Sequence, residues 1–225
     1  MQYGEIMLKG AVFDFDGTLF DSMFIWDTIG GDYLRSIGYS PREDINEILK
    51  PMSLYQAAGY FRSEYGVRLS PEEITEGVNR RIEHFYLNEV QPKENAEHFL
   101  QMLSGHGVRM CLATATDRHL VEPALVRCGM EKYFGGIFTC SSAGAGKDSP
   151  LIFREAMHFL GTGKQETWIF EDARHAVMTA KEDGFNVAAV YDRYEENQTF
   201  IKKTADYYLK DYSDFESFWK AASGV

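Results

Sequence analysis

The sequence predicts an α/β fold in which a doubly wound parallel sheet carries a helical insertion after its first strand. Two observations support this prediction. Apolar, β-branched runs of strand length alternate with amphipathic segments of helical length along most of the 225 residues. The alternation stops between residues 22 and 90, where helical patterns follow one another without a buried strand. Strands and helices at this spacing imply parallel strands joined by right-handed crossovers.

The predicted strands are short runs rich in apolar and β-branched residues. They cover residues 7–15, 108–113, 136–140, 167–170, 187–191 and 206–209. The helices between them are expected at residues 96–103, 120–128, 150–160 and 174–183. Sheets of this kind bind ligands beyond the carboxyl ends of their strands. We therefore look for functional residues in the loops that follow the strands.

The insertion is predicted to be a separate helical domain. Its helices are expected at residues 24–37, 45–49, 54–65 and 71–86. Ser70 and Pro71 mark the start of the last one, because a capping serine, a proline and two acids stand in order there. Residues 91–93 are the expected return linker. The expected domains are residues 1–21 with 91–225, and residues 22–90, the latter placed after the first strand as a lid.

The composition excludes several classes of protein. Hydrophobic residues make up 44% and charged residues 25%, which is ordinary for a globular protein. The net charge of −11 argues against a nucleic-acid or anionic-membrane surface, and no apolar run approaches a span of ~20 residues. The first ten residues lack a secretory pattern, and the three cysteines lack metal-ligand spacing. We expect a cytoplasmic protein with reduced thiols, as a monomer or weak dimer.

The most informative stretch is residues 14–18, DFDGT. It follows an apolar run at residues 10–13, so Asp14 and Asp16 emerge where the first strand ends and a glycine turns the chain. Taken alone, a short acidic turn is most often a solvated turn. Carboxylates are costly to bury unless they are paired or bound to metal. The residues that follow the other strands therefore decide the interpretation.

Polar groups follow three further strands. The second ends at Thr114, the third leads through a glycine-rich loop to Lys147, and the fourth is followed by Glu171 and Asp172. Each has an ordinary alternative. Thr114 simply ends a strand, Lys147 is a solvated loop lysine, and the two acids cap the helix that starts near residue 173. Agreement in order, residue type and position at four strand ends favours a common site.

Carboxylates, a hydroxyl and an ammonium on one rim suit phosphoryl transfer. Carboxylates can hold Mg²⁺, which prefers hard oxygen ligands and bridges to phosphate. The hydroxyl of Thr114 and the ammonium of Lys147 can bind phosphate oxygens, and an aspartate can act as a nucleophile. Catalysis is then mainly positioning and charge neutralisation. The metal and Lys147 would make the pocket locally positive inside an acidic protein.

The chain resembles the haloacid dehalogenase-superfamily hydrolases with a helical cap, the subfamily of β-phosphoglucomutases and related phosphatases. Residues 14–22 resemble the first motif of that family, Thr114 the second, Lys147 with Pro150 the third, and Glu171 with Asp172 the fourth. The resemblance covers nearly the whole chain. It implies a Rossmann-like core with an inserted cap, and a hydrolase that acts on phosphoric monoesters.

The resemblance also implies residue roles. Asp14 is the nucleophile, and Asp16 protonates the leaving oxygen and then helps to activate water. The expected Mg²⁺ ligands are Asp14, the backbone carbonyl of Asp16 and Asp172, with Glu171 direct or through water. The presence of Asp16 disfavours dehalogenation, because dehalogenase members lack the second aspartate of the first motif.

Substrate contacts follow from the same resemblance. Thr114, Ala115 and Lys147 are expected to bind the transferring phosphoryl group. Trp26 is a candidate substrate contact under the cap, and packing in the core of the cap is an equally weighted alternative. Residues 93–95 replace the glycine that the family has in the cap-return turn, which leaves the conformation of that turn open.

The expected function is a Mg²⁺-dependent phosphatase that hydrolyses a small phosphorylated metabolite, such as a sugar phosphate, through an aspartyl-phosphate. The alternative is a phosphosugar mutase of the β-phosphoglucomutase type. Trp26 stands where these mutases have a histidine, and Leu54 stands where they have an arginine. Arg81 lies near a cap position that is basic in mutases, which leaves a phosphate contact in the cap open. The absence of the histidine and of the arginine favours the phosphatase.

Overall fold

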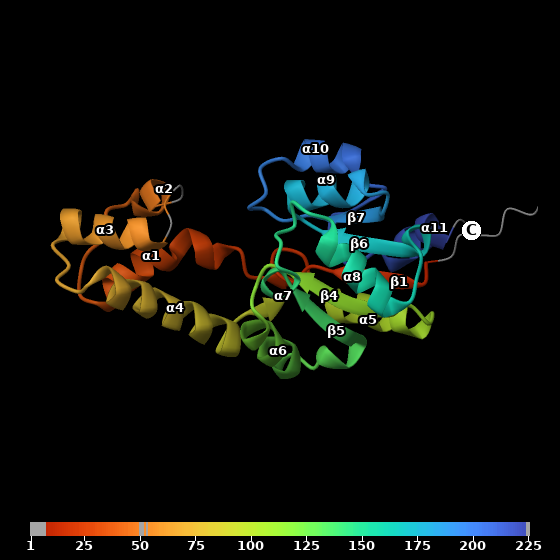
Figure 1. Ribbon diagram of the computed structural model, residues 1–225, viewed down its shortest axis with the longest axis horizontal. Helices are drawn as coiled ribbons and strands as arrows, with labels where there is room; N and C mark the ends of the chain where they lie inside the picture. The colour runs from red at the N-terminus through yellow and green to blue at the C-terminus, as the bar shows by residue number, and fades with distance from the viewer. Residues whose placement is uncertain (1–7, 50–51, 53, 224–225) are drawn as a thin grey trace, which may run out of the picture. The chain divides into compact units, whose positions relative to one another are not determined.

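The computed structural model describes residues 8–49, 52 and 54–223 (Figure 1). It divides into two compact units, one made of residues 1–21 and 91–225 and the other of residues 22–90. The predicted start of the first strand at residue 7 lies outside the described residues.

The larger unit is built on a parallel sheet with the strand order β5-β4-β1-β6-β7-β8. The six strands are β1 (Gly10–Phe13), β4 (Arg109–Thr114), β5 (Phe134–Thr139), β6 (Thr167–Glu171), β7 (Asn186–Val190) and β8 (Tyr207–Leu209). All six predicted strands are present, and the predicted doubly wound α/β fold is confirmed. Because β5, β4, β1 and β6 are neighbours, the loops after these four strands meet at one edge.

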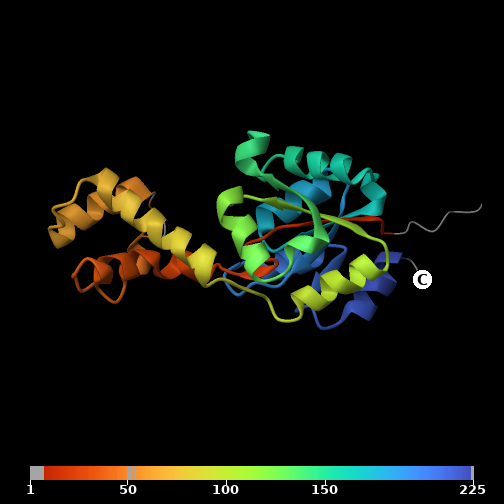
Figure 2. The same cartoon turned by 90° about the horizontal axis from the view of Figure 1, so that it is seen from below.

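Helices cover both faces of this sheet. The predicted ones are α5 (Ala96–Gly105), α6 (Arg118–Arg127), α8 (Leu151–Leu160) and α9 (Arg174–Glu182). The helices not predicted from the sequence are α7 (Cys140–Ala143), α10 (Gln198–Thr204) and α11 (Phe215–Ser223), with the 3₁₀ turns η1 (Glu131–Tyr133) and η2 (Lys164–Glu166). Figure 2 shows α5 and α8 on opposite sides of the sheet.

Alternate side chains of the strands supply the two halves of the core. Val12 and Ile169 belong to a buried cluster with residues of α8, α9 and α10. On the opposite face, Phe13 stacks on Phe170 with ring centroids 4.1 Å apart. Phe170 in turn packs on Phe99 of α5 at 5.8 Å. Burial on both faces explains why the central strands are almost continuously apolar.

The smaller unit contains the four predicted helices. They are α1 (Phe24–Ser36), α2 (Ile45–Leu49), α3 (Leu54–Tyr65) and α4 (Pro71–Asn88). The predicted start of α4 is confirmed as a capping box, in which Glu73 N donates to Ser70 Oγ at 3.2 Å and Ser70 N donates to Glu73 Oε2 at 2.7 Å. Tyr33 and Phe61 stack in the buried interior of the unit.

The two chain segments that join the units form a small ribbon within the larger unit. The antiparallel strands β2 (Phe20–Asp21) and β3 (Gln91–Pro92) pair Phe20 with Pro92 and Asp21 with Gln91. The next residue, Lys93, donates from its backbone to Leu19 O at 2.8 Å. Strands of two residues are too short to show a periodic pattern, so they were not predicted from the sequence.

A buried ion pair fixes the return linker. Lys93 Nζ donates to Tyr191 O at 2.6 Å and to Asp192 Oδ2 at 2.9 Å, in the loop after β7. The side chains of Lys93 and Asp192 are 16% and 3% exposed. The neighbouring Arg193 lies 3.9 Å from Asp21 on the outgoing linker, in an exposed pair. One loop of the core therefore contacts both linkers.

The turn at residues 93–95, whose conformation the sequence left open, has a left-handed backbone at Asn95. Asn95 has a φ of 61°, the single positive φ of a residue other than glycine in the part of the chain that the structure describes. Asparagine tolerates this left-handed region better than most residues do. Asn95 thus adopts a backbone conformation that glycine would also accommodate.

We expect Asn95→Val to lower the free energy of unfolding by about 1–2 kcal/mol, because a β-branched side chain disfavours left-handed backbone. Asn95→Gly should change it by less than about 1 kcal/mol. Urea unfolding measures both, and Glu94→Val at the exposed neighbouring position is the control. Equal losses for Asn95→Val and Glu94→Val would contradict the backbone explanation.

Asp192→Asn should lower the free energy of unfolding by about 3 kcal/mol, because it leaves the largely buried ammonium of Lys93 without its counter-charge. Asp21→Asn removes the exposed partner of Arg193 and should cost less than about 1 kcal/mol. The same urea titration compares them. Similar small losses in both variants would show that Lys93 is solvated.

Candidate active site

The loop after β1 is shaped by a tight turn. Asp14 is buried, and its backbone N–H donates to Phe170 O of β6 at 3.0 Å, which carries the ladder past the end of the strand. Gly17 has a φ of +72°, and a Cβ there would lie 2.3 Å from Asp172 Oδ2. Only glycine satisfies both conditions without strain.

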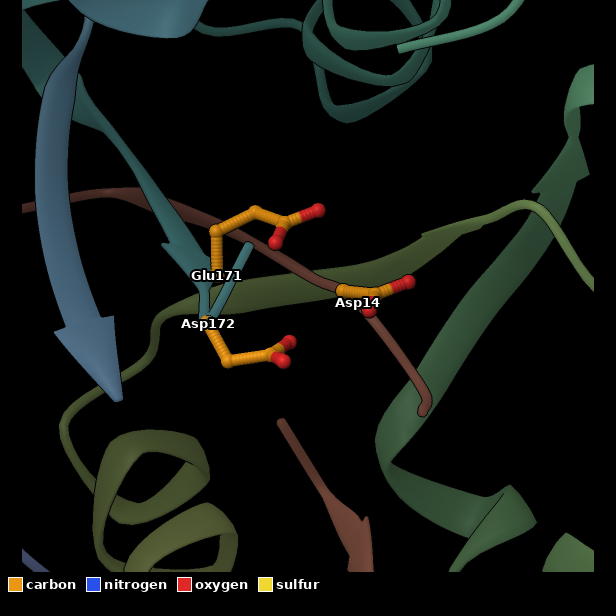
Figure 3. A group of neighbouring side chains, drawn as sticks. All are labelled: Asp14, Glu171 and Asp172. Carbon is orange, nitrogen blue, oxygen red and sulfur yellow. The ribbon is translucent and has the colours of Figure 1, made fainter. Parts of the chain in front are cut away.

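Three buried carboxyl groups meet beyond the strand ends. One oxygen from each of Asp14, Glu171 and Asp172 lies within 4.8 Å of the others. Figure 3 shows the three side chains reaching from the ends of β1 and β6 toward a common space. The sequence predicted that these residues share a rim, and the structure brings them together. We call these three residues the acidic group.

Lys147 lies against the acidic group. Its ammonium forms ion pairs with Asp14 Oδ1 and with Glu171 Oε1, the latter at 2.6 Å. Lys147 is only 6% exposed, so the alternative of a solvated loop lysine is wrong. Glu171 also accepts Ala173 N at 2.9 Å through Oε2, but Ala173 precedes the first turn of α9, whose Arg174 N–H is accepted by Glu195 instead. Both oxygens of Glu171 are therefore hydrogen-bonded within the protein.

Asp16 is not one of the three residues whose carboxylate oxygens lie within 4.8 Å of one another. It is half-buried, and its Oδ2 accepts a hydrogen bond of 2.6 Å from the hydroxyl of Thr116. Thr116 also donates from its backbone to Thr114 Oγ1 at 3.1 Å. Thr114 is fully buried and Ala115 is exposed. The metal-binding prediction for Asp16 concerned its backbone carbonyl and stays a prediction.

Two hydroxyls support the acids and were given no role from the sequence. Thr18 Oγ1 donates to Asp172 Oδ1 at 2.8 Å, and Thr116 holds Asp16 as described. Both threonines lie within a few residues of a predicted site residue, and this closeness in sequence is the one local sign that they could belong to the site. Their partners are more than 90 residues away in the chain, so the pairing itself was not readable.

The structure decides against one of the two alternatives for Trp26, which is packing in the core of its unit. Trp26 is 46% exposed on the first turn of α1, so it is not part of the core of its unit. The neighbouring Phe24 does pack in that unit, edge to face on Phe85 at 5.1 Å. A substrate contact by Trp26 stays a prediction.

The acidic group carries an excess of negative charge in a buried place. Burial raises the pKa of Asp14 to about 8, helped by Glu171 and Asp16 and opposed by Lys147. Burial and the charges of Glu171 and Asp14 also raise the pKa of Asp172 well above its usual value, against the hydrogen bond from Thr18. Burial alone would lower the pKa of Lys147, but the facing carboxylates raise it.

These charges suit a divalent cation. Three ionised carboxylates and one ammonium leave two negative charges, which one divalent cation would balance. The donors are all carboxylate oxygens, as Mg²⁺ prefers. Buried carboxylates without such a partner are costly, which is the physical reason for the raised pKa values.

The sequence matches one family model over residues 11–190, described as haloacid dehalogenase-like hydrolase. The chain belongs to this family. The resemblance found in the motifs is thereby confirmed, and so is the prediction of a hydrolase. No curated protein matches the sequence. Within the described residues, no helix is both long and apolar enough to span a membrane.

Solved structures of haloacid dehalogenase-like proteins share the fold. A Thermotoga maritima protein described as a beta-phosphoglucomutase has a TM-score of 0.83 at 19% identity, covering 94% of this chain and 98% of its own. CbbY from Rhodobacter sphaeroides, in complex with phosphate, has a TM-score of 0.71 at 20% sequence identity, and the match covers 93% of this chain and 97% of CbbY. A predicted phosphoglycolate phosphatase from Haemophilus somnus has a TM-score of 0.74 at 18% sequence identity, and the match covers 94% of this chain and 97% of that protein.

The metal-free hydrolase should lose stability as pH rises. The folded protein holds the proton of Asp14 up to about pH 8, whereas an unfolded chain releases it near the usual value of 3.8. The folded state therefore binds more protons in this window, and its free energy of unfolding falls across it. We expect the Tm in chelator to fall from about pH 5 to about pH 8.5.

Asp14→Asn is the control for this titration, because it removes the ionisable group and keeps the shape. Its Tm should fall less steeply than that of the wild type over the same range, so that the variant is the more stable protein at the alkaline end. Parallel curves for the two proteins would contradict a raised pKa at Asp14.

Proposed function

We propose that this protein is a Mg²⁺-dependent phosphatase that hydrolyses a small phosphorylated metabolite through an aspartyl-phosphate. The observation that carries the proposal is the burial of Lys147 against Asp14 and Glu171, with Asp172 beside them. This arrangement unites a nucleophile, a cation for phosphate oxygens and oxygen ligands for a metal. Membership of the hydrolase family supports the same reaction class.

The reaction proceeds in two displacements. A carboxylate oxygen of Asp14 attacks phosphorus in line, an O–P bond forms, and the bond from phosphorus to the ester oxygen breaks. Asp16 gives its proton to the departing oxygen. Asp16 then takes a proton from the water that attacks the aspartyl-phosphate, and inorganic phosphate leaves with Asp14 restored. The hydroxyl of Thr116 orients Asp16 for these transfers.

The remaining residues bind and neutralise. Lys147 and Thr114 hold the phosphoryl oxygens. Asp14, Asp172 and the backbone carbonyl of Asp16 would hold Mg²⁺, which when bound neutralises charge on the phosphoryl group. Glu171 would hold the cation directly or through water, because each of its oxygens accepts one hydrogen bond from the protein and keeps a second lone pair. A bound cation also favours the ionised form of Asp14 that the attack requires.

The substrate is proposed to be a sugar phosphate or a similar small monoester. CbbY, a relative in fold, is solved in complex with phosphate, and a mutant of it is solved in complex with xylulose-1,5-bisphosphate. Trp26, exposed on the helical unit, is the proposed contact to the organic part. The three cysteines are free, which fits the proposed cytoplasmic location, and the proposed state is a monomer or weak dimer.

The nucleophile is tested with p-nitrophenyl phosphate. Asp14→Asn should lower kcat by a factor on the order of 10³ or more, because the amide is a poor nucleophile. Chelation of Mg²⁺ should abolish wild-type turnover, and added Mg²⁺ should restore it. Asp148→Asn is the matched control, since Asp148 is an exposed acid beside Lys147. Wild-type turnover in Asp14→Asn would overturn the assignment.

A phosphosugar mutase is the second candidate, favoured by the fold shared with the Thermotoga maritima protein. Incubation of β-glucose 1-phosphate with a trace of the 1,6-bisphosphate separates the two. Free phosphate without glucose 6-phosphate supports the phosphatase. Glucose 6-phosphate without free phosphate would establish the mutase instead.

A further inference from the structure

A tyrosine from the C-terminal part of the chain supports the loop after β1 from behind. Tyr212 follows β8 and lies beyond the range of the family model, which ends at residue 190. It is 1% exposed, and its hydroxyl donates to the backbone carbonyl of Thr18 at 3.1 Å. Its ring packs edge to face on Phe99 of α5 at 5.1 Å. The phenol is thus held by its ring and by its hydroxyl.

Thr18, whose carbonyl accepts from Tyr212, also contacts the acidic group through its side chain. Its hydroxyl donates to Asp172 Oδ1 at 2.8 Å, while the other carboxylate oxygen lies against Gly17 so closely that no Cβ fits between them. The carboxylate of Asp172 therefore has one oxygen hydrogen-bonded to this loop and the other in contact with it. A small shift of residues 17 and 18 would turn or displace the carboxylate.

The hydrogen bonds from Tyr212 to Thr18 and from Thr18 to Asp172 are both buried and so are costly to break. Thr18 is fully buried, and its carbonyl can only accept, so the proton between the two groups belongs to Tyr212. Burial and the charges of Asp172 and Asp14 raise the pKa of Tyr212 well above its usual value, which keeps the phenol a donor. Removing the hydroxyl would leave the Thr18 carbonyl without this donor.

We propose that Tyr212 is a positioning residue that, through Thr18, sets the orientation in which Asp172 binds a divalent cation. Tyr212 itself touches neither substrate nor metal. The inference rests on the proposed role of the acidic group as a cation site, and it assigns part of that role to the segment after β8. Groups behind metal ligands commonly tune affinity in this way.

The test is the affinity of Tyr212→Phe for Mg²⁺ alone, measured by calorimetry and by the rise in Tm on adding Mg²⁺ at fixed pH. The variant keeps the ring on Phe99 and loses only the donor. We expect the Kd for Mg²⁺ to rise about tenfold, the low end of the range for groups behind metal ligands.

Tyr208→Phe is the matched control. Tyr208 lies four residues earlier, and its hydroxyl donates to Gln198 Oε1 at 2.8 Å, away from the acidic group. This variant also loses one tyrosine hydrogen bond, so it measures any general loss of stability. Its Kd for Mg²⁺ should equal that of the wild type.

Thr18→Val tests the second link and serves if Tyr212→Phe folds poorly. It removes the hydroxyl that holds Asp172, and it should weaken Mg²⁺ binding at least as much. Adding Tyr212→Phe to Thr18→Val should then weaken binding by less than tenfold, because the path through Thr18 is already broken. Thr18→Ser keeps the hydroxyl and should retain most of the affinity.

The outcomes separate this inference from the proposed function. A wild-type protein that fails to bind Mg²⁺ would overturn the cation site and the positioning role together. Mg²⁺ binding by the wild type with an unchanged Kd in Tyr212→Phe would overturn only the positioning role. A loss of Tm in Tyr212→Phe without a change in Kd has the same meaning, because it reduces Tyr212 to a packing residue.

Discussion

The contact of Lys147 with Asp14 and Glu171 is the interaction on which the site depends. It joins the loops that follow β1, β5 and β6, and it places one positive charge where three carboxylates would otherwise repel one another. A buried ammonium is tolerated only because the carboxylates face it, and they are tolerated in part because of the ammonium. Neither partner would be stable there alone.

One ammonium does not balance three carboxylates, so the site is short of positive charge. Hydrogen bonds from Thr18 and from the backbone of Ala173 stabilise individual oxygens, but they add no net charge. The raised pKa values of Asp14 and Asp172 express the remaining imbalance. A phosphate monoester would enlarge it, so a substrate of that kind and a divalent cation are expected to bind together.

The strand order explains why four separate segments reach one place. β1 lies in the middle of the sheet between β4 and β6, and β5 lies beside β4. Both faces of these strands are covered, so polar residues are admitted only where the strands end. The acidic group and Thr114 stand at or just after such ends, so the closely packed strands fix their positions. Lys147 follows β5 by way of α7 and a loop, and its ion pairs hold it there.

The sequence was informative wherever the signal was local. The presence of the six strands and the start of α4 after Ser70 follow from short patterns, and these predictions hold. The contacts of Thr116 with Asp16 and of Tyr212 with Thr18 join residues 100 and 194 positions apart, so no local pattern reveals them. The ion pairs of Lys147 with Asp14 and Glu171 were not readable for the same reason, because they depend on strands that meet only in the fold.

The pairing of β2 with β3 has a consequence for how this protein can change. Asp21 and Gln91 are neighbours across the ribbon, so the 22–90 segment leaves the core and returns at one point. The entropy of closing a loop grows only with the logarithm of its length. Lengthening, shortening or replacing that segment therefore changes the free energy of folding of the sheet only slightly. The core and the inserted segment can therefore evolve at separate rates within one chain.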